Sequence, residues 1–237
     1  MGEDQPVIYR ERPSTVPGVT LWQRQVAPVP RTMRIMPDGC LDLLWDGRRL
    51  LIAGPDTRAR EHVCPAGVAY AALRFSGGTG PALLGIPADV LRDQTVRLEE
   101  LLPPVEVRLL TERVAAGPVA ALERWLQARA GAHPVDPLGP RVLAMARAGL
   151  PVSDMAARLG LSPRQLHRRC LSNFGYGPRR LTRVLRFSRL CDEGGSGVPL
   201  AQLAHAVGYA DQAHLSREVR ELAGTTPARL VQLLTAG

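Results

Sequence analysis

Arginine, glutamine and histidine side chains gather in two similar stretches in the last third of the chain. Residues 155–169 have the sequence MAARLGLSPRQLHRR, and residues 203–218 have the sequence LAHAVGYADQAHLSRE. A guanidinium group can donate two hydrogen bonds to O6 and N7 of guanine, and a glutamine amide can pair with N6 and N7 of adenine. These residue types therefore favour contact with the edges of DNA base pairs, provided that each stretch presents them on one face of a helix.

Both stretches have the spacing of a helix-turn-helix unit. A small alanine lies where two helices would cross, and a glycine four residues later supplies the positive φ that ends the first helix. Each unit closes with G-x-x-P, in which glycine ends one helix and proline can begin the next. One copy alone would fit any helical hairpin equally well, but two copies in register favour a tandem DNA-binding module. The matched pairs are Ala156 and Ala204, Gly160 and Gly208, both 48 residues apart, and then Leu166 and Leu215, Arg168 and Arg217, Gly175 and Gly224, Pro178 and Pro227, all 49 residues apart.

Apolar periodicity predicts seven helices in this part of the chain. The fourth would join the two units and, at 1.5 Å per residue, would be about 24 Å long. That length suits two recognition helices in successive major grooves, about 34 Å apart on one face of a duplex. The expected helices cover residues 138–148, 152–159, 163–173, 178–193, 199–207, 212–223 and 227–234.

The positive charge of the protein belongs to the same part of the chain. Residues 1–140 contain 16 arginines and 16 acidic residues, whereas residues 141–237 contain 14 arginines and 6 acidic residues, which is the whole net charge of +8. A solvated basic face would be the simplest explanation, but it does not account for the balanced first part. A polyanionic partner of the last part does.

The first part of the chain has the pattern of a small β-barrel or sandwich with flanking helices. Strands are expected at 34–36, 40–45, 48–53, 62–63 and 68–75, with turns at residues 37–39 and 46–47. Helices are expected at 88–93, 105–115 and 118–130, followed by a Pro- and Gly-rich linker at 131–140. The expected fold class is α+β. A β-rich sensor or dimerisation domain with C-terminal helices covers residues 1–130, and an all-α seven-helix domain with two helix-turn-helix units covers 141–237.

Composition and cysteine usage narrow the class of protein. The chain has 237 residues, 45% of them apolar, which suits two globular domains. It has no signal-peptide pattern and no apolar run near the ~18 residues of a membrane span, so we expect a cytoplasmic protein without a membrane partner. The four cysteines, at 40, 64, 170 and 191, include no C-x-x-C pair, so we expect no metal and no cofactor.

The second unit resembles the DNA-binding domain of the AraC/XylS family of bacterial transcription regulators. The resemblance covers about residues 138–234 and is most specific at 206–227, AVGYADQAHLSREVRELAGTTP. The chain departs from the family at Cys170, Leu215 and Val219, where aromatic residues are usual; these are core positions, so the departures concern packing more than DNA binding. The front part, with MPDGCLDLLW and LGIPADVL, resembles an uncharacterised domain that precedes this module in such regulators, and that resemblance implies no ligand.

The resemblance assigns base contacts to outward positions near the start of each recognition helix. Arg168 and Arg217, which are equivalent, are the strongest candidates, and a phosphate contact or a surface ion pair is the alternative for each. The full set is Arg164, Gln165, His167 and Arg168 in the first unit, and Gln212, Ala213, His214, Ser216 and Arg217 in the second.

Phosphate contacts would position the protein without selecting a sequence. Two of the candidates precede proline and have the pattern of helix N-caps, where backbone N–H groups can also hold a phosphate. The candidates are Ser162, Arg169, Arg179, Arg180, Arg220 and Thr226, with Ser162 and Thr226 as the caps.

A second candidate site lies in the front part, where Cys40, Asp42, Tyr70 and Arg74 are candidates to line an effector cavity. Alternation along residues 40–45 places Cys40, Asp42 and the residue at 44 on one face, and the apolar residues at 41, 43 and 45 on the other. We interpret Trp45 as core. The arginine at 74 within AALRF would either pair with an acid or bind an anionic effector.

The sequence therefore predicts a sequence-specific transcription regulator without enzymatic activity. Its partner is double-stranded DNA, and its front domain senses a small-molecule effector or mediates dimerisation; RNA polymerase and a second copy of the chain are further candidate partners. One alternative is a regulator without an effector, controlled by dimerisation or by a protein partner. A less favoured alternative is a DNA repair methyl acceptor of the Ada type, which would need clustered cysteine ligands for zinc. A well-formed cavity within residues 1–100 would favour the sensor.

Overall fold

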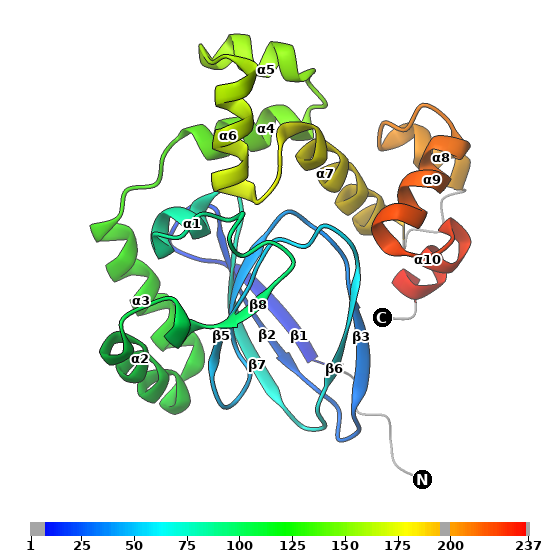
Figure 1. Ribbon diagram of the computed structural model, residues 1–237. Helices are drawn as coiled ribbons and strands as arrows, with labels where there is room; N and C mark the ends of the chain where they lie inside the picture. Colours follow the sequence, from blue (N-terminus) through cyan, green and yellow to red (C-terminus); the bar gives the residue numbers. More distant parts are fainter. Residues whose placement is uncertain (1–7, 195–199, 236–237) are drawn as a thin grey trace.

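The computed structural model describes residues 8–194 and 200–235 and divides them into a β-rich front part and a helical back part (Figure 1). The front part has strands with three flanking α-helices, and the back part has seven helices in sequence. The expected α+β fold class, with a seven-helix domain after the β-rich one, is confirmed.

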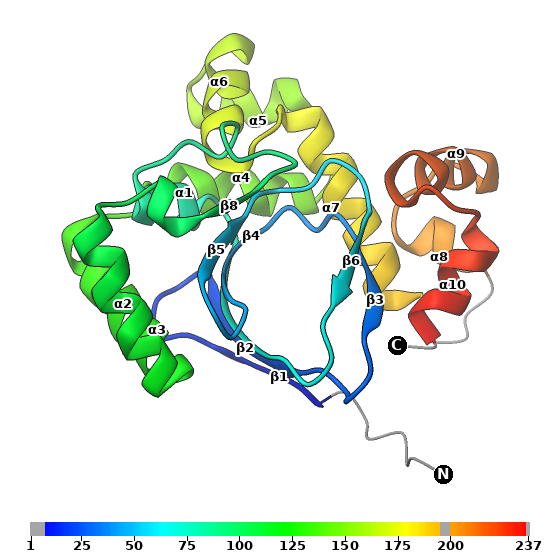
Figure 2. The ribbon, with the colours of Figure 1, turned by 60° about the horizontal axis from the view of Figure 1, so that its bottom comes forward.

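The strands form a six-stranded sheet and a separate two-stranded ribbon, and neighbouring strands in both are antiparallel. The sheet has the order β1-β2-β7-β4-β5-β8, and the ribbon consists of β3 and β6. Sheet and ribbon curve around a common interior and together make the barrel (Figure 2). The strands are β1 (Ile8–Pro13), β2 (Val19–Gln25), β3 (Arg31–Ile35), β4 (Leu41–Trp45), β5 (Leu50–Ala53), β6 (Arg60–Cys64), β7 (Ala69–Phe75) and β8 (Thr95–Arg97).

The side chains of strand β4 alternate between the apolar core on one face of the sheet and the barrel interior on the other. Leu41, Leu43 and Trp45 are buried in the main apolar core, whereas Asp42 and Leu44 face the interior of the barrel. The predicted alternation along this strand, with Trp45 as core, is confirmed. Because side chains alternate with a period of two, one strand can both seal the core and line a cavity.

Helices α2 (Pro104–Ala116) and α3 (Pro118–Ala132) cover the core face of the sheet, and both match predicted helices. The helix predicted at 88–93 is wrong. That segment forms turns closed by bonds to the third residue back, from Val90 N–H to Pro87 O and from Leu91 N–H to Ala88 O. Asp93 then adopts φ 59°, a left-handed conformation that a helix cannot continue. Helix α1 (Thr79–Leu84), the short 3₁₀ turn η1 (Leu98–Glu100) and strands β1, β2 and β8 are elements that the sequence patterns did not indicate.

The helices of the back part lie within one residue of their predicted bounds, apart from residue 199, which lies outside the described residues. The helices are α4 (Leu138–Arg147), α5 (Val152–Leu159), α6 (Pro163–Phe174), α7 (Pro178–Glu193), α8 (Leu200–Ala206), α9 (Gln212–Ala223) and α10 (Pro227–Thr235). Helices α6, α7, α9 and α10 begin at a proline or after a capping side chain, and α5, α6 and α9 end at a glycine; residues of these kinds fixed the predicted bounds.

Helix α7 joins the two helix-turn-helix units and contributes to both of their cores. Its first half packs into the first unit through Leu181 and Val184, and its second half packs into the second unit through Phe187 and Leu190. Each unit has its own core, and α7 is part of both, so α7 determines the distance between the two units.

The front and back parts meet closely. Helix α3 ends at Ala132 and α4 begins at Leu138, so both helices extend into the linker expected at 131–140. The backbones at Gly77 and Gly139 lie so close that a Cβ at Gly139 would overlap the carbonyl oxygen of Gly77. No helix in the described part of the chain is long and apolar enough to cross a membrane.

Candidate nucleic-acid interface and barrel cavity

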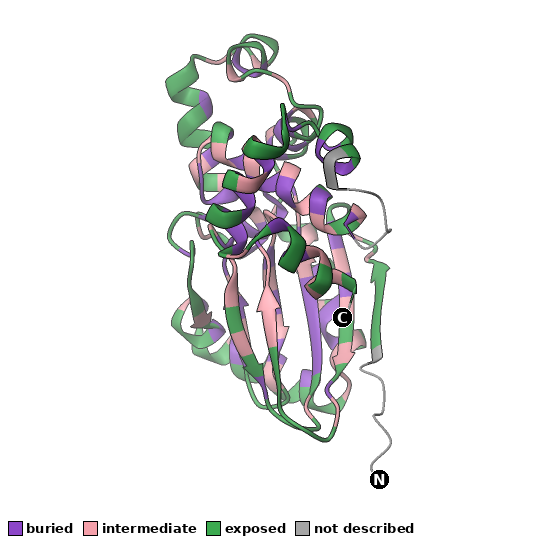
Figure 3. Ribbon diagram, turned by 90° about the vertical axis from the view of Figure 1, so that its right-hand side faces the viewer, coloured by how far each residue is buried: buried purple, intermediate pink, exposed green. Residues whose placement is uncertain are grey.

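The recognition helix of the first unit, α6, begins with a capping box. The N–H of Gln165 donates to Ser162 Oγ at 3.3 Å, and the N–H of Ser162 donates to Gln165 Oε1 at 2.8 Å. The expected N-cap at Ser162 is therefore confirmed. Arg164 and Arg168 are exposed on the outer face, and neither has an acidic partner among the described residues. Exposed residues cover the outward faces of the helices of the back part (Figure 3).

The recognition helix of the second unit, α9, begins at the equivalent position with Asp211. The Asp211 carboxylate accepts a hydrogen bond from the N–H of His214 at 2.6 Å. Gln212, Ala213 and Arg217 are exposed, and Arg217 has no acidic partner in the part of the chain that the structure describes. The structure thus brings the two equivalent arginines, Arg168 and Arg217, to the outer surface at matching places on the two helices.

Three core positions depart from the resembled family, and all three are buried. Cys170, Leu215 and Val219 are each 0% exposed. Burial raises the pKa of the Cys170 thiol to about 12, so that side chain acts as a small apolar group. All three side chains thus lie in the cores of the two units and do not form part of their outer faces.

A buried glutamate ties α9 to the joining helix α7. Glu218 is 2% exposed, and its carboxylate lies 3.5 Å from Arg183 Nε, 3.6 Å from Arg186 Nη1 and 3.1 Å from His214 Nε2. The His214 ring also packs edge-on against Tyr209. His214, a predicted base contact, is thus engaged inside the unit. The four-residue spacing of His214 and Glu218 was a signal that sequence analysis did not use.

The predicted phosphate contacts fall into three kinds. Thr226 caps α10 by accepting from the N–H of Arg229 at 3.3 Å, as expected. Arg179 and Arg220 are exposed, and Arg169 is exposed in an ion pair with Asp136 at 3.5 Å. Arg180 differs from the expectation because it is half-buried and donates to the carbonyl oxygen of Thr57 in the front part at 3.2 Å.

Two of the remaining predicted base contacts, Gln165 and His167, are exposed but also contact their own unit, and the third is less exposed. The His167 side chain lies against Gly177, and Ser216 is half-buried. The Gln165 carbonyl serves the capping box, which leaves the amide NH₂ of that side chain as its outward donor.

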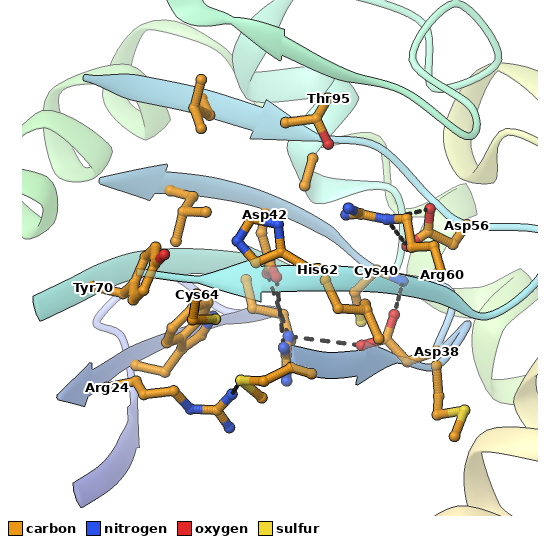
Figure 4. A pocket seen from close by; sticks show the side chains of 18 of the residues that line it. Arg24, Asp38, Cys40, Asp42, Asp56, Arg60, His62, Cys64, Tyr70 and Thr95 are labelled. Atoms are coloured by element: carbon orange, nitrogen blue, oxygen red, sulfur yellow. Dashed lines mark hydrogen bonds and ion pairs between the residues drawn. The ribbon is translucent and has the colours of Figure 1, made fainter. Parts of the chain in front are cut away.

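A cavity of about 500 Å³ occupies the interior of the barrel, between the sheet and the ribbon. Its walls contain all four predicted effector residues: Arg74, and Cys40, Asp42 and Tyr70, which Figure 4 labels. Lining residues that sequence analysis missed come mainly from β2, which was not predicted, and from β3 and β6, which were predicted in part. They include Trp22, Arg24, Met33, Asp38, Arg60 and His62.

Most charges that line the cavity neutralise one another. Arg74 Nε lies 3.3 Å from Asp42 and 3.7 Å from Asp38, which decides the alternatives for this arginine in favour of an acid partner. Arg60 Nε lies 3.0 Å from Asp56. Burial raises the pKa of Asp42 to about 6, while the charge of Arg74 acts in the opposite direction.

The two front cysteines, Cys40 and Cys64, are both free thiols. No cluster of three or more His, Cys, Asp or Glu side chains suited to a metal occurs among the described residues. Burial, with Asp38 and Asp42 nearby, raises the pKa of the Cys40 thiol well above its ordinary value. A thiol that stays protonated is a poor nucleophile, which speaks against Cys40 as a methyl acceptor.

The loops and strands that line the cavity also contact the helical part. The N–H of Ala59, just before β6, donates to Leu222 O of the second unit at 2.6 Å. A Cβ at Gly224 would lie 3.0 Å from Arg34 of β3, and Met36 packs against the core of the second unit. The first unit is contacted through Ala88, whose N–H donates to Ser172 O at 2.8 Å.

A tandem of helix-turn-helix units, with capped recognition helices and exposed arginines on a basic domain, defines a DNA-binding protein. Residues 155–232 match the model of a helix-turn-helix domain of AraC type, and residues 19–97 match a domain of unknown function, DUF6597. The chain thus has an AraC-type helix-turn-helix DNA-binding domain, with that domain of unknown function in front of it. No curated protein matches the chain in sequence.

Solved structures from two bacteria are among those similar to this chain. The C-terminal domain of AraT, a response regulator from Geobacillus stearothermophilus, is 21% identical over 42% of this chain and 87% of its own, with a TM-score of 0.38. ToxT from Vibrio cholerae O395 is 11% identical over 98% of both chains, with a TM-score of 0.47. Wild-type ToxT from strain SCE256, with a bound unsaturated fatty acid, is 10% identical over 100% of this chain and 99% of its own, with a TM-score of 0.49.

Proposed function

We propose that this protein is a sequence-specific transcription regulator that places α6 and α9 in successive major grooves and responds to a small molecule in the barrel. The observation that carries the proposal is the equivalence of Arg168 and Arg217. Both are exposed at the same position of a capped recognition helix, and neither is neutralised by an acid among the described residues. An arginine in that position is suited to guanine.

The other outward side chains complete a plausible set of base contacts. Arg164 precedes Arg168 by one helical turn, and Gln212 lies at the first turn of α9. In this proposal His214 has an anchoring role, because its ring already contacts Glu218 and Tyr209.

Phosphate contacts come from residues at the edges of the same face. Arg169, Arg179 and Arg220 are exposed, and the capped N-termini at Ser162 and Thr226 offer backbone N–H groups. Such contacts give affinity that falls with salt and fix the register of the protein on the duplex.

The barrel cavity supports the effector part of the proposal. Its volume of about 500 Å³ lies within the range of pockets for small organic ligands. Its ribbon wall contacts the second unit at Ala59 and Arg34. A ligand that moves the ribbon would therefore move a surface that the second unit contacts. The resulting change in DNA affinity can be no larger than the difference in the ligand's affinity for the two positions of the ribbon.

Selection of bound fragments from genomic DNA by the purified full chain tests this proposal. We expect the selected fragments to share two short motifs centred about one helical turn, or roughly 10 base pairs, apart. Affinity for them should fall steeply with salt but stay above that for unrelated DNA. Fragments that share no motif would overturn sequence-specific binding, whereas an occupancy that no small molecule alters would overturn only the effector part.

A further inference from the structure

We infer that the barrel cavity takes an organic monoanion, a carboxylate on an apolar body, and that Arg24 holds the carboxylate. The inference rests on the proposed effector role of the cavity and specifies its ligand class. It starts from the charges that line the cavity, because one of them has no counterpart.

Four arginines line the cavity, and three of them have acidic partners. Arg74 is paired with Asp42 and Asp38, and Arg60 with Asp56. Arg34 lies 3.9 Å from Glu61 at the rim. Arg24 has no carboxylate within 4 Å among the described residues, so one positive charge in the cavity is left without compensation.

The hydrogen-bonding groups of Arg24 are also poorly satisfied. Its Nε is buried and has no partner among the described residues, and Nη1 is directed at the Met33 sulfur, a weak acceptor. The guanidinium otherwise stacks over the Tyr9 ring, with 5.1 Å between its carbon and the ring centroid. Leaving a buried donor of a charged group unpaired is costly, and an anionic acceptor would remove that cost.

Burial also disfavours the positive charge of this guanidinium. The pKa of Arg24 is lowered chiefly by burial. An arginine side chain nevertheless stays protonated in proteins, so the group remains a cation that favours an anion beside it.

The surroundings of Arg24 determine the rest of the ligand. Val26, Cys64 and Tyr70 form a small apolar cluster at this end of the barrel, with Trp22 and Met33 packed against it. Asp38 and Asp56 lie on the side of the cavity away from Arg24, Cys64 and Tyr70, and Asp42 lies between the two sides, where it is paired with Arg74 (Figure 4). A second negative charge on the ligand would meet those acids, whereas an apolar body would lie against aromatic and sulfur-containing side chains. The geometry therefore favours a monocarboxylate over a dicarboxylate or a cation.

Matched pairs of charged and neutral probes test the inference on the full chain by isothermal titration calorimetry. The probes are octanoate with octanamide, and 3-phenylpropanoate with 3-phenylpropanamide, which differ in charge but hardly in apolar surface. For the wild type, the acid of at least one pair should bind at least tenfold more tightly than its amide.

Variants at Arg24 then locate the anion. Arg24→Met should reduce the preference for the acid to less than threefold, and Arg24→Lys, which keeps the charge, should retain most of it. Arg48→Met, at an exposed turn residue of the barrel, is the matched control and should leave the preference unchanged. Thermal denaturation of each variant separates loss of binding from loss of folding, and the lysine variant keeps the test decisive if the methionine variant unfolds.

Several outcomes would overturn the inference: equal binding of acid and amide by the wild type, binding of neither member of any pair, or an unchanged preference in folded Arg24→Met. DNA occupancy is measured in parallel on the same samples. Acid binding that depends on Arg24 but leaves DNA occupancy unchanged would uphold this inference and overturn the effector role. Failure of the carboxylate probes would not bear on DNA binding itself.

Discussion

The two helix-turn-helix units present the same outer face but are anchored by different means. Position by position, Ser162 corresponds to Asp211 as the N-cap, and Arg168 corresponds to Arg217 as the exposed arginine. One residue further along, the first unit has the exposed Arg169 where the second has the buried Glu218. The same outer face is thus presented by a recognition helix that is held mainly by apolar packing in the first unit and by a buried ionic cluster in the second.

The anchors differ in what they attach to. In the first unit, α6 is buried through apolar residues, its one ion pair in the described part of the chain is the exposed contact of Arg169 with Asp136, and its C-terminal end contacts the front part through Ser172. In the second unit, Glu218 connects α9 to two arginines of α7. The orientation of α9 therefore depends on a buried carboxylate, whereas the ion pair of α6 is exposed.

The largest expected effects come from the residues that the two units share. Arg168→Ala and Arg217→Ala should each lower affinity for the selected DNA by about 1–3 kcal/mol, roughly 5- to 150-fold, with altered base preference at one position of the corresponding motif. Competition binding against single-base variants of the site measures both. Arg10→Ala, at the barrel edge, removes the same charge and is the control. Equal weakening on all sequences would mean that these arginines contact phosphates, and an effect in one unit only would break the functional equivalence.

The next effect distinguishes the anchors. Glu218→Gln should lower the free energy of unfolding by about 2 kcal/mol, less than for a fully buried pair because the partner arginines can reach water. Arg169→Gln, at the equivalent exposed position, should change it by less than about 0.5 kcal/mol. Urea denaturation followed by circular dichroism gives both values. Similar losses in the two variants would contradict the difference in anchoring.

The helix caps should show a smaller contrast. Ser162→Ala should cost about 1 kcal/mol of stability, and Asp211→Ala slightly more, because the aspartate also carries a charge that favours the helix N-terminus. Thermal denaturation at low and high salt tests this, with the exposed Ser172→Ala as control. Added salt should diminish the Asp211 effect and leave the Ser162 effect in place; the opposite dependence would refute the assignment.

The smallest effects concern two adjacent arginines at the start of α7. Arg179→Ala should make the salt dependence of DNA binding shallower by about one unit of slope, as expected for the loss of one phosphate contact. Arg180→Ala should leave the slope unchanged and instead lower stability by about 1 kcal/mol, since its partner is Thr57 O. A reduced slope for Arg180→Ala would show that its side chain leaves the front part when DNA binds.

Local signals made the helical part predictable to within a residue. Gly160, Gly175 and Gly224 end helices in the left-handed conformation, and Ser162 caps the next one, so the bounds follow from short-range chemistry. The ion pair between Arg183 and the buried Glu218 was not predicted. The two residues are far apart in sequence, and only the packing of α7 against α9 brings them together.

The front part was predictable only where strands are apolar and adjacent. β4 and β5 form a hairpin and were expected, although its turn is centred one residue later than predicted, since Asp46 N–H bonds to Arg49 O. β1 has the sequence IYRERP with polar residues on both faces, and β8 has three residues, so neither has an alternating apolar pattern. Because β2 was also missed, Arg24 could not be placed in a cavity, whereas Asp42 and Arg74 on the two apolar strands could.

The two-faced ribbon of β3 and β6 constrains how this protein can diverge from its relatives. Arg60, His62 and Cys64 line the cavity, while the adjoining Ala59 is bonded to the second helix-turn-helix unit. A substitution in the ribbon would alter both the barrel cavity and the contact with the second unit. During evolution, substitutions in the ribbon are therefore expected to change ligand preference and the response to DNA together. The opposite wall, formed by β4 and β7, adjoins the first unit instead, through Gly39 beside Leu185 and Gly77 beside Leu143.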